Sequence, residues 1–234
     1  MKKATTVLLH LLFGLILLLP AGKLVSSCFG CTFRLVSVPS FAIGIALLSA
    51  CAAIFCVAFE DTAKSRPMSI WKTLLFPLSL INAALFLLES RTILTVVSAA
   101  VFVGCCCFMT ARYGKPLALK ITALVLSILM IIPIAAFGFI ALIFGDIAQS
   151  AVVQTIESPD GKYYAQVIDS DQGALGGDTI VNVHEQGGLN AGIFIIEKKP
   201  KRVYLGEWGE FEDMQIHWKE DGCLVINTVE YKIE

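Results

Sequence analysis

Asp, Glu, Lys and Arg are missing from the middle of the long apolar runs that fill the first 145 residues. Proton pumps, ion transporters and intramembrane enzymes need such groups at depth to bind an ion or perform chemistry. His10 and Asn82 are the only candidates for such a role well inside these runs, and we interpret each as a local hydrogen-bonding group. Permeation of a small molecule stays as an alternative that would need a polar path of Asn82, His10 and scattered Ser and Thr.

Motifs for nucleotide, calcium and nucleic-acid binding are also missing. The glycine-rich stretches GALGGD and EQGGLNAG, residues 173–178 and 185–192, do not precede a predicted helix. They therefore cannot hold phosphate at a helix N-terminus, and we predict that they are hairpin loops. No EF-hand calcium loop occurs, and we expect no cofactor. Nucleic acid is excluded as a partner because the polar C-terminal part is acidic and would be repelled by phosphate.

Apolar residues are abundant, at 56% of the chain against 16% charged residues, which is abnormal for a soluble protein. A helix needs about 20 apolar residues to cross hydrocarbon. Five segments qualify as membrane spans: 5–22, 41–59, 70–88, 92–111 and 119–145. Pro133 is expected to kink the last of them. Small residues on the second and fourth spans predict close helix packing, namely Ala42, Ala46, Ala50 and Ala53, and Ala100 with Gly104.

The charge is divided between two halves of opposite sign. Residues 1–145 carry 11 Lys+Arg and 3 Asp+Glu, whereas residues 146–234 carry 7 and 16. The change in sign coincides with the end of the apolar runs. We therefore predict a transmembrane helical region at 1–145 and a separate domain at 146–234, with the boundary near Gly145 and Asp146.

Positive residues in the short connections predict the orientation of the spans, because cytoplasmic loops carry an excess of Lys and Arg. One side has eight of them: Lys2, Lys3, Lys64, Arg66, Lys72, Arg112, Lys115 and Lys120. The other side has three: Lys23, Arg34 and Arg91. This distribution favours a cytoplasmic N-terminus, and five spans then place the C-terminal domain outside the cell.

The N-terminal segment MKKATTVLLHLLFGLILLLPAG has two interpretations. Its length favours a retained span. Two lysines, an apolar core and small residues are also typical of a signal peptide, and cleavage after Gly22 would leave four spans with the C-terminal domain on the same side. A third alternative, lipidation of Cys28 in VSSC, is weakened by Lys23, which interrupts the apolar run.

Most of the eight cysteines lie within predicted spans, where cysteine behaves as a small hydrophobic residue. Consecutive cysteines on a helix, such as 105–107, point in different directions and cannot hold a tetrahedral metal together. Cys28 and Cys31 form a CxxC spacing in a connection predicted to be outside, so a disulfide or a thiol-redox pair is an alternative. We predict that this connection has no strand leading into a helix, which a thioredoxin-like site requires.

From about residue 152 the apolar period changes to two, in segments rich in Val, Ile and Tyr. Turn residues separate these segments at 159–161, 176–178, 187–188, 199–200 and 221–222. Six to eight short antiparallel strands in a segment of this size predict a small all-β sandwich, an open barrel or a blade-like domain. In the first turn, Pro159 fixes φ, Asp160 caps through its side chain, and Gly161 adopts positive φ.

Two segments carry a resemblance to a known kind of repeat. SPDGKYYAQV, residues 158–167, resembles the turn and strand of a WD40-like propeller repeat, and IHWKEDGCLVIN, residues 216–227, resembles the complementary hairpin. Only one or two blades would fit, so no propeller is expected. Combined with the membrane spans, the pattern looks like small membrane-anchored extracytoplasmic β domains of Gram-positive bacteria, which carry fewer spans. The resemblance implies a location and no activity.

Three groups of residues in the C-terminal domain are candidates for binding. Glu207, Glu210, Glu212 and Asp213, followed by Glu220 and Asp221, form an acidic patch that could bind a cation or basic peptide, or serve solubility alone. His184 and His217 fall on the polar faces of predicted strands, where they are solvated or bind a metal with Asp178 or Glu185. The basic run KKPKR, residues 198–202, is interpreted as a charged strand edge, with anionic headgroups as an alternative contact.

These observations favour a non-enzymatic bacterial integral membrane protein of the cytoplasmic membrane. It would display a small acidic β domain outside the cell for interaction with a protein or the cell envelope. The alternatives are an extracytoplasmic thiol-redox protein using Cys28 and Cys31, and small-molecule permeation by the helical bundle.

Overall fold

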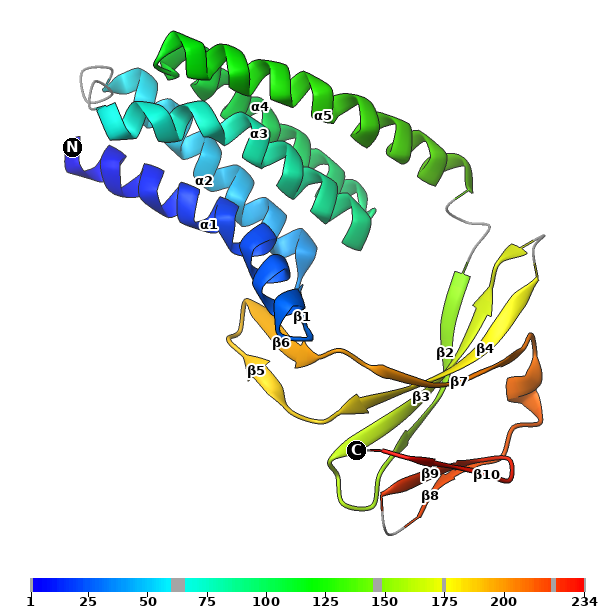
Figure 1. The fold of residues 1–234 in the computed structure, drawn as a ribbon. Coiled ribbons are helices and arrows are strands. Elements are labelled where there is room, and N and C mark those ends of the chain that lie inside the picture. Colours follow the sequence, from blue (N-terminus) through cyan, green and yellow to red (C-terminus); the bar gives the residue numbers. More distant parts are fainter. Residues whose placement is uncertain (1, 60–65, 145–148, 174–175, 220–221, 234) are drawn as a thin grey trace. The chain divides into compact units, whose positions relative to one another are not determined.

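The computed structural model describes residues 2–59, 66–144, 149–173, 176–219 and 222–233 (Figure 1). The chain forms two compact units. The first comprises Met1–Phe29, Phe33–Phe137 and Asn190–Ile195, and the second comprises Gly30–Thr32, Gly138–Leu189 and Ile196–Glu234. Each unit therefore includes a short segment from the other part of the sequence: Asn190–Ile195 belongs to the first unit and Gly30–Thr32 to the second. The predicted boundary at Gly145 and Asp146 lies outside the described residues.

Five helices form the first part of the chain: α1 (Lys2–Cys28), α2 (Val38–Ala58), α3 (Arg66–Glu89), α4 (Ile93–Tyr113) and α5 (Leu117–Phe144). All five are long and apolar enough to cross a membrane, over Thr5–Cys28, Val38–Ala58, Ile70–Glu89, Ile93–Tyr113 and Leu117–Ala136. The prediction of five spans is confirmed, and the chain is a multi-pass membrane protein. The first helix extends to Cys28, beyond the predicted end at residue 22, because neither Pro20 nor Gly22 ends it.

Side-chain caps mark where two of the helices begin. Ser37 precedes α2 and accepts a hydrogen bond from the backbone N–H of Ser40 at 3.3 Å. Thr92 precedes α4 and accepts from the N–H of Thr95 at the same distance. Such caps satisfy backbone donors that have no partner within the helix.

The bundle packs α4 against α2 and α3, while α1 also packs against α2 and α3. Ala42, Ala46 and Ala53 are buried on α2 and Ala50 is half-buried, so three of the four residues of the predicted small-residue face are buried. The prediction for Ala100 and Gly104 is wrong, because both are exposed. The buried face of α4 is formed by larger residues, including Phe102, Cys106, Met109 and Tyr113.

The two polar candidates within the spans make local or interhelical hydrogen bonds. The Nδ2 of Asn82 donates to the carbonyl oxygens of Ile16 at 2.8 Å and Leu78 at 3.0 Å. The Nδ1 of His10 is 2.6 Å from the carbonyl oxygen of Thr6. The interpretation of both as hydrogen-bonding side chains is confirmed: Asn82 links α3 to α1, and His10 bonds within its own helix.

The β domain is a sandwich of two antiparallel sheets, as one of the predicted alternatives had it. The four-stranded sheet has the order β2-β3-β4-β7, formed by β2 (Gln149–Glu157), β3 (Tyr163–Asp171), β4 (Gly177–Glu185) and β7 (Lys201–Glu207). The three-stranded sheet has the order β10-β9-β8, formed by β8 (Ile216–Trp218), β9 (Cys223–Ile226) and β10 (Val229–Lys232). The hairpin that resembles part of a blade thus belongs to a separate sheet from the SPDGKYY strand.

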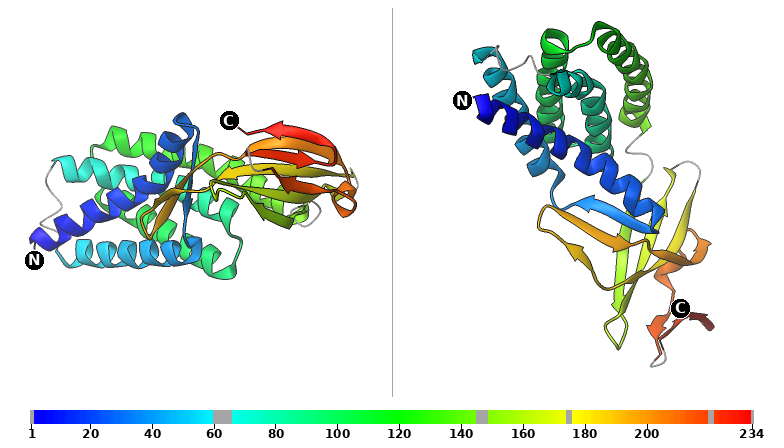
Figure 2. Two further views of the ribbon diagram at one scale, coloured as in Figure 1. Left: turned by 90° about the horizontal axis from the view of Figure 1, so that it is seen from below. Right: turned by 60° about the vertical axis from the view of Figure 1, so that its left-hand side comes forward.

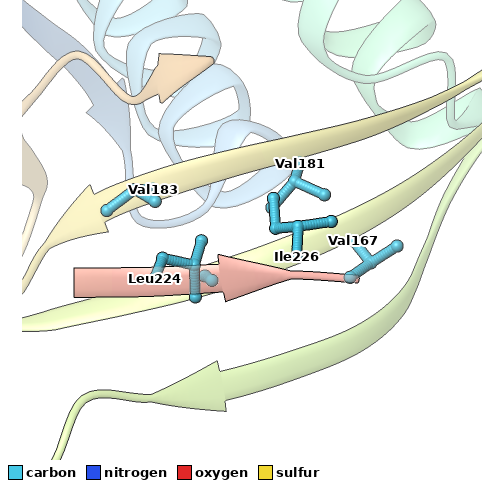
Figure 3. Close-up of a cluster of buried hydrophobic side chains, with 6 residues drawn as sticks. Val167, Val181, Val183, Leu224 and Ile226 are labelled. Atoms are coloured by element: carbon cyan, nitrogen blue, oxygen red, sulfur yellow. The ribbon is translucent and has the colours of Figure 1, made fainter. Parts of the chain in front are cut away.

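One apolar cluster joins the two sheets. Ala165, Val167, Val181 and Val183 of the larger sheet pack against Leu224 and Ile226 of the smaller one (Figure 3). Trp218 closes the edge of this core, and its Nε1 donates to the carbonyl oxygen of Ile156 at 3.1 Å. Alternate residues of β3 and β4 therefore face the core, while their neighbours face outward.

The turn at residues 158–163 has the predicted chemistry. Gly161 has a φ of +67°, and the Asp160 carboxylate accepts from the backbone N–H of Lys162 and the hydroxyl of Ser158. These two hydrogen bonds, the backbone one first, lower the pKa of the Asp160 carboxyl. The hydroxyl of Ser158 in turn accepts from the N–H of Tyr163 at 2.9 Å. The turn thus sets the start of β3.

A third sheet has the order β1-β6-β5, formed by β1 (Cys31–Leu35), β5 (Gly188–Asn190) and β6 (Phe194–Lys198) (Figure 2). The prediction that the connection between the first two spans has no strand is wrong, because β1 lies there. The strand forms through a partner that is about 160 residues away in sequence, which a local pattern does not reveal.

We predict that Leu224→Ala destabilises the β domain by about 2–5 kcal/mol, because the fully buried side chain leaves a cavity between the sheets. Amide hydrogen exchange in β3 and β4, measured on the full chain, reports this loss. Val229→Ala is the control, since Val229 is exposed, and should change the free energy of unfolding by less than about 0.5 kcal/mol. Equal exchange rates in the two variants would contradict the assigned core.

Candidate functional site

The predicted acidic residues Glu207, Glu210, Glu212 and Asp213 gather on one short connection of the β domain. Glu207 ends β7, a 3-10 turn (η3) spans Glu210–Glu212, and Asp213 follows it. Gly209 has a φ of +80°, a conformation that favours glycine and allows the chain to turn sharply there. Glu220 and Asp221, the remaining members of the predicted patch, lie outside the described residues.

Glu210 has a structural role within this connection. Its carboxylate accepts from the hydroxyl of Tyr204 at 2.5 Å and from the backbone N–H of Glu207 at 3.1 Å. A Cβ on Gly206 would lie 2.0 Å from the carboxylate oxygen of Glu210, so glycine is needed for this approach. The Glu210 carboxylate therefore fixes the connection to β7. Glu207, Glu212 and Asp213 are exposed to solvent.

The contact with Glu210 changes the pKa of Tyr204. The hydrogen bond to the Glu210 carboxylate, together with its negative charge, raises the pKa of Tyr204 to about 12. The phenol thus remains protonated, and donates to Glu210, throughout the neutral range.

Trp208 lies between these residues and is 56% exposed. Its ring approaches Gly177, where an added Cβ would lie 2.6 Å from the indole Cδ1. Glycine at 177 thus lets the ring rest against the start of β4 while the rest of the indole stays accessible. Around it is an open pocket of about 620 Å³, lined by Tyr204, Gly206, Glu207, Trp208, Gly209 and Glu210.

Two acidic residues are cross-strand partners at this end of the larger sheet. Asp178 of β4 is the cross-strand partner of Glu207, so both side chains lie on the same face of the sheet. Like charges placed directly opposite each other in a β-sheet are unfavourable. Asp178 accepts from the Nε2 of Gln172 at 2.7 Å, which orients it. Sequence periodicity missed Trp208 as a member because its approach to Gly177 depends on which strands are neighbours.

The structure does not bring the two histidines together. His184 stacks on Tyr164, with ring centroids 4.6 Å apart, on the outer face of the larger sheet. His217 is exposed between two core-facing residues of the smaller sheet, Ile216 and Trp218. The core therefore separates them. Among the described residues no group of three His, Cys, Asp or Glu could hold a metal.

Cys28 and Cys31 lie on either side of a tight turn. Cys28 is the exposed last residue of α1, and Cys31 is the half-buried first residue of β1. Gly30 between them has a φ of +67°. A thioredoxin-like nucleophile instead lies at the N-terminus of a helix, where backbone N–H groups stabilise a thiolate. The redox alternative stays a prediction that this geometry does not favour.

The basic run 198–202 lies at a sheet edge, as predicted. Lys201 and Arg202 are exposed on β7, the edge strand of the larger sheet. Lys198 pairs with Glu185 at 2.6 Å, and this hydrogen bond raises the pKa of Lys198. Charges on an edge strand discourage pairing with another chain.

Lys72 was placed by the sequence in a connection between spans, but it lies inside α3 and is 1% exposed. Its Nζ lies 5.2 Å from the ring centroid of Tyr113 at the end of α4, a distance that allows a cation–π contact. The positive count on the first side of the membrane falls accordingly. The predicted span 70–88 already included position 72, so the sequence itself indicated that Lys72 lies within a helix.

Comparison with known protein families, with curated proteins and with solved structures found no match for this chain. The geometry of its own residues is therefore what supports a function.

We predict that Glu210→Gln moves the ionisation of Tyr204 from a pH of about 12 toward the ordinary tyrosine value of 10, because the negative acceptor is removed. A raised pKa stabilises the fold fully below pH 10, and that contribution disappears as the pH rises toward 12. Ultraviolet titration of tyrosinate absorbance, with Tyr204→Phe to assign the signal, measures the shift. Glu212→Gln is the matched control, and a shift of the same size there would contradict the assigned contact.

Proposed function

We propose that this chain is a bacterial integral membrane protein that displays its β domain outside the cell to bind a protein or cell-envelope partner. The pocket around Trp208 is the binding site, and the partner presents a cationic side chain or amine to it. The observation that carries the proposal is the half-exposed indole of Trp208 in a pocket whose lining includes Glu207 and Glu210.

A cation suits this site for two reasons. The face of a tryptophan ring attracts ammonium and guanidinium groups, and carboxylates complete the attraction through their charge. Glu210 accepts the hydrogen bond of Tyr204, so among the lining residues Glu207 supplies the charge toward a ligand. A volume of about 620 Å³ is within the range of about 300–1,000 Å³ that is common for small-ligand sites.

The charge of the whole domain supports the same class of partner. With 16 Asp+Glu against 7 Lys+Arg in residues 146–234, the domain attracts basic ligands from a distance and repels acidic ones. The connection 206–214 contains four acidic residues and no basic residue, so the field is strongest near the pocket.

The extracytoplasmic location rests on the distribution of Lys and Arg. With Lys72 set aside as a buried residue of α3, seven positive residues still lie on the N-terminal side against three on the other. This asymmetry supports a cytoplasmic N-terminus. An odd number of spans then supports a β domain on the opposite side.

We expect Trp208→Ala to weaken binding of a pentalysine peptide to the full chain in liposomes by about 2- to 30-fold, the range that cation–π energies imply. Glu207→Gln should also weaken binding, and added salt should reduce the difference. Peptide binding is measured by fluorescence anisotropy, with pentaglutamate as the probe control.

Glu157→Gln is the charge-matched control variant, because Glu157 lies at the opposite end of the larger sheet and should leave binding unchanged. Binding of pentaglutamate as tight as that of pentalysine, or equal affinity in Trp208→Ala and the parent chain, would refute the site.

For the orientation, we expect alkaline phosphatase fused after Glu234 to be active and a cytoplasm-dependent reporter at the same position to be inactive. The phosphatase folds only outside the reducing cytoplasm because it needs disulfides. The reverse pattern of reporter activity would place the β domain in the cytoplasm.

A further inference from the structure

The connection between α1 and α2, residues 29–37, joins the ends of two membrane spans. The first span ends and the second begins on the same face of the bilayer. The connection between them therefore lies at the membrane surface, whichever side that is. Anything bound tightly to it within the same compact unit lies at that surface too.

A segment from the distant part of the chain is bound to this connection. Asn190–Ile195 belongs to the same compact unit as the helices. The N–H of Val36 donates to the carbonyl oxygen of Ile193 at 3.0 Å, and the rings of Phe33 and Phe194 stack with centroids 4.9 Å apart. Phe33 is in turn buried against Gly22 of α1, where an added Cβ would lie 2.7 Å from its ring.

The segment is unusually apolar for its domain. Residues 187–196, GGLNAGIFII, contain no charged side chain, although residues 146–234 as a whole carry a large excess of acidic residues. Ile193 is 54% exposed. Phe29 and Val36 of the connection are 79% and 52% exposed. Large apolar residues thus remain uncovered at the level where the spans meet the membrane surface.

Two backbone N–H groups of the turn are satisfied within the protein. The N–H of Ala191 donates to the carbonyl oxygen of Phe194 at 3.0 Å, and the N–H of Gly192 donates to the side chain of Asn190 at 2.9 Å. A segment that leaves water must have such partners, because an unpaired backbone group in lipid costs several kcal/mol. These two donors therefore keep their hydrogen bonds when the turn enters the headgroup layer.

We infer that the Asn190–Ile195 turn, together with Phe29, is an interfacial membrane anchor whose apolar side chains insert into the leaflet at the end of α1. The occupant of this apolar surface is the bilayer itself, because the surface continues the lipid-facing end of α1, where Leu24 and Val25 are also exposed. The anchor is independent of the ligand at Trp208 and of the side of the membrane.

The test uses the full chain in phospholipid liposomes, with a benzophenone analogue of phenylalanine introduced at position 193 or, separately, at 29. After irradiation, both positions should form lipid adducts on the upper part of the acyl chains, since interfacial residues lie about 5–10 Å into the headgroup and acyl boundary. Mass spectrometry of the labelled peptides identifies the adducts. At position 29 the analogue replaces a phenylalanine, which is a small change. The variant at 29 can therefore still be measured if the variant at 193 fails to fold.

The control position is 229, because Val229 is equally exposed, at 53%, on the β domain away from this segment's sheet. It should give no lipid adduct. Lipid adducts absent at both 193 and 29, or a covalent dimer of the chain in their place, would overturn the inference and assign the surface to water or to a second copy. The pentalysine measurement tests the pocket at Trp208, and its outcome does not depend on the outcome of the lipid crosslinking.

Discussion

Every polar group within the helical unit needs a partner in the protein, because hydrocarbon offers none. Asn82 bonds to the carbonyl oxygen of Ile16 on another helix. The hydroxyl of Thr110 donates to the carbonyl oxygen of Lys72 and accepts from the N–H of Phe76. These contacts connect α1 to α3 and α3 to α4, so the same requirement that makes the spans helical also sets which helices are neighbours.

Serine residues meet the requirement in a different way. The hydroxyls of Ser49, Ser79 and Ser127 each donate to a carbonyl oxygen three or four residues earlier in the same helix. Such bonds satisfy the hydroxyl donor without linking two helices. Among the described helices, Thr5 Oγ1 and Asn82 Oδ1 are buried without a hydrogen-bond partner, and the open pocket lies in the β domain.

In the β domain, the small core between two sheets leaves the connections free to carry other chemistry. Val167, Val181, Leu224 and Ile226 hold the sandwich together without using an acidic residue. Glu210 then fixes the connection after β7 through Tyr204, and Trp208 is held half-exposed against Gly177. A rigid connection with an accessible ring loses little conformational freedom on binding, which favours affinity.

Local sequence patterns predicted the elements that depend on local interactions. Apolar runs longer than the hydrocarbon thickness determined five helices, alternation determined the strands of the sandwich, and Ser-Pro-Asp-Gly determined its turn. The candidate site was predicted only in part. Glu207 and its acidic neighbours were visible as a charge cluster, but the separate roles of Glu210 and Trp208 were not.

The sequence by itself therefore determined the fold class, the division into a membrane part and a β part, and the acidic character of the second. Tertiary structure alone decided that β1 forms, that Lys72 turns inward, that Ala100 and Gly104 face outward, and that Asp178 opposes Glu207. The physical reason is that each of these outcomes depends on a partner far away in the chain or on strand register, and helical or strand periodicity reports only interactions between near neighbours.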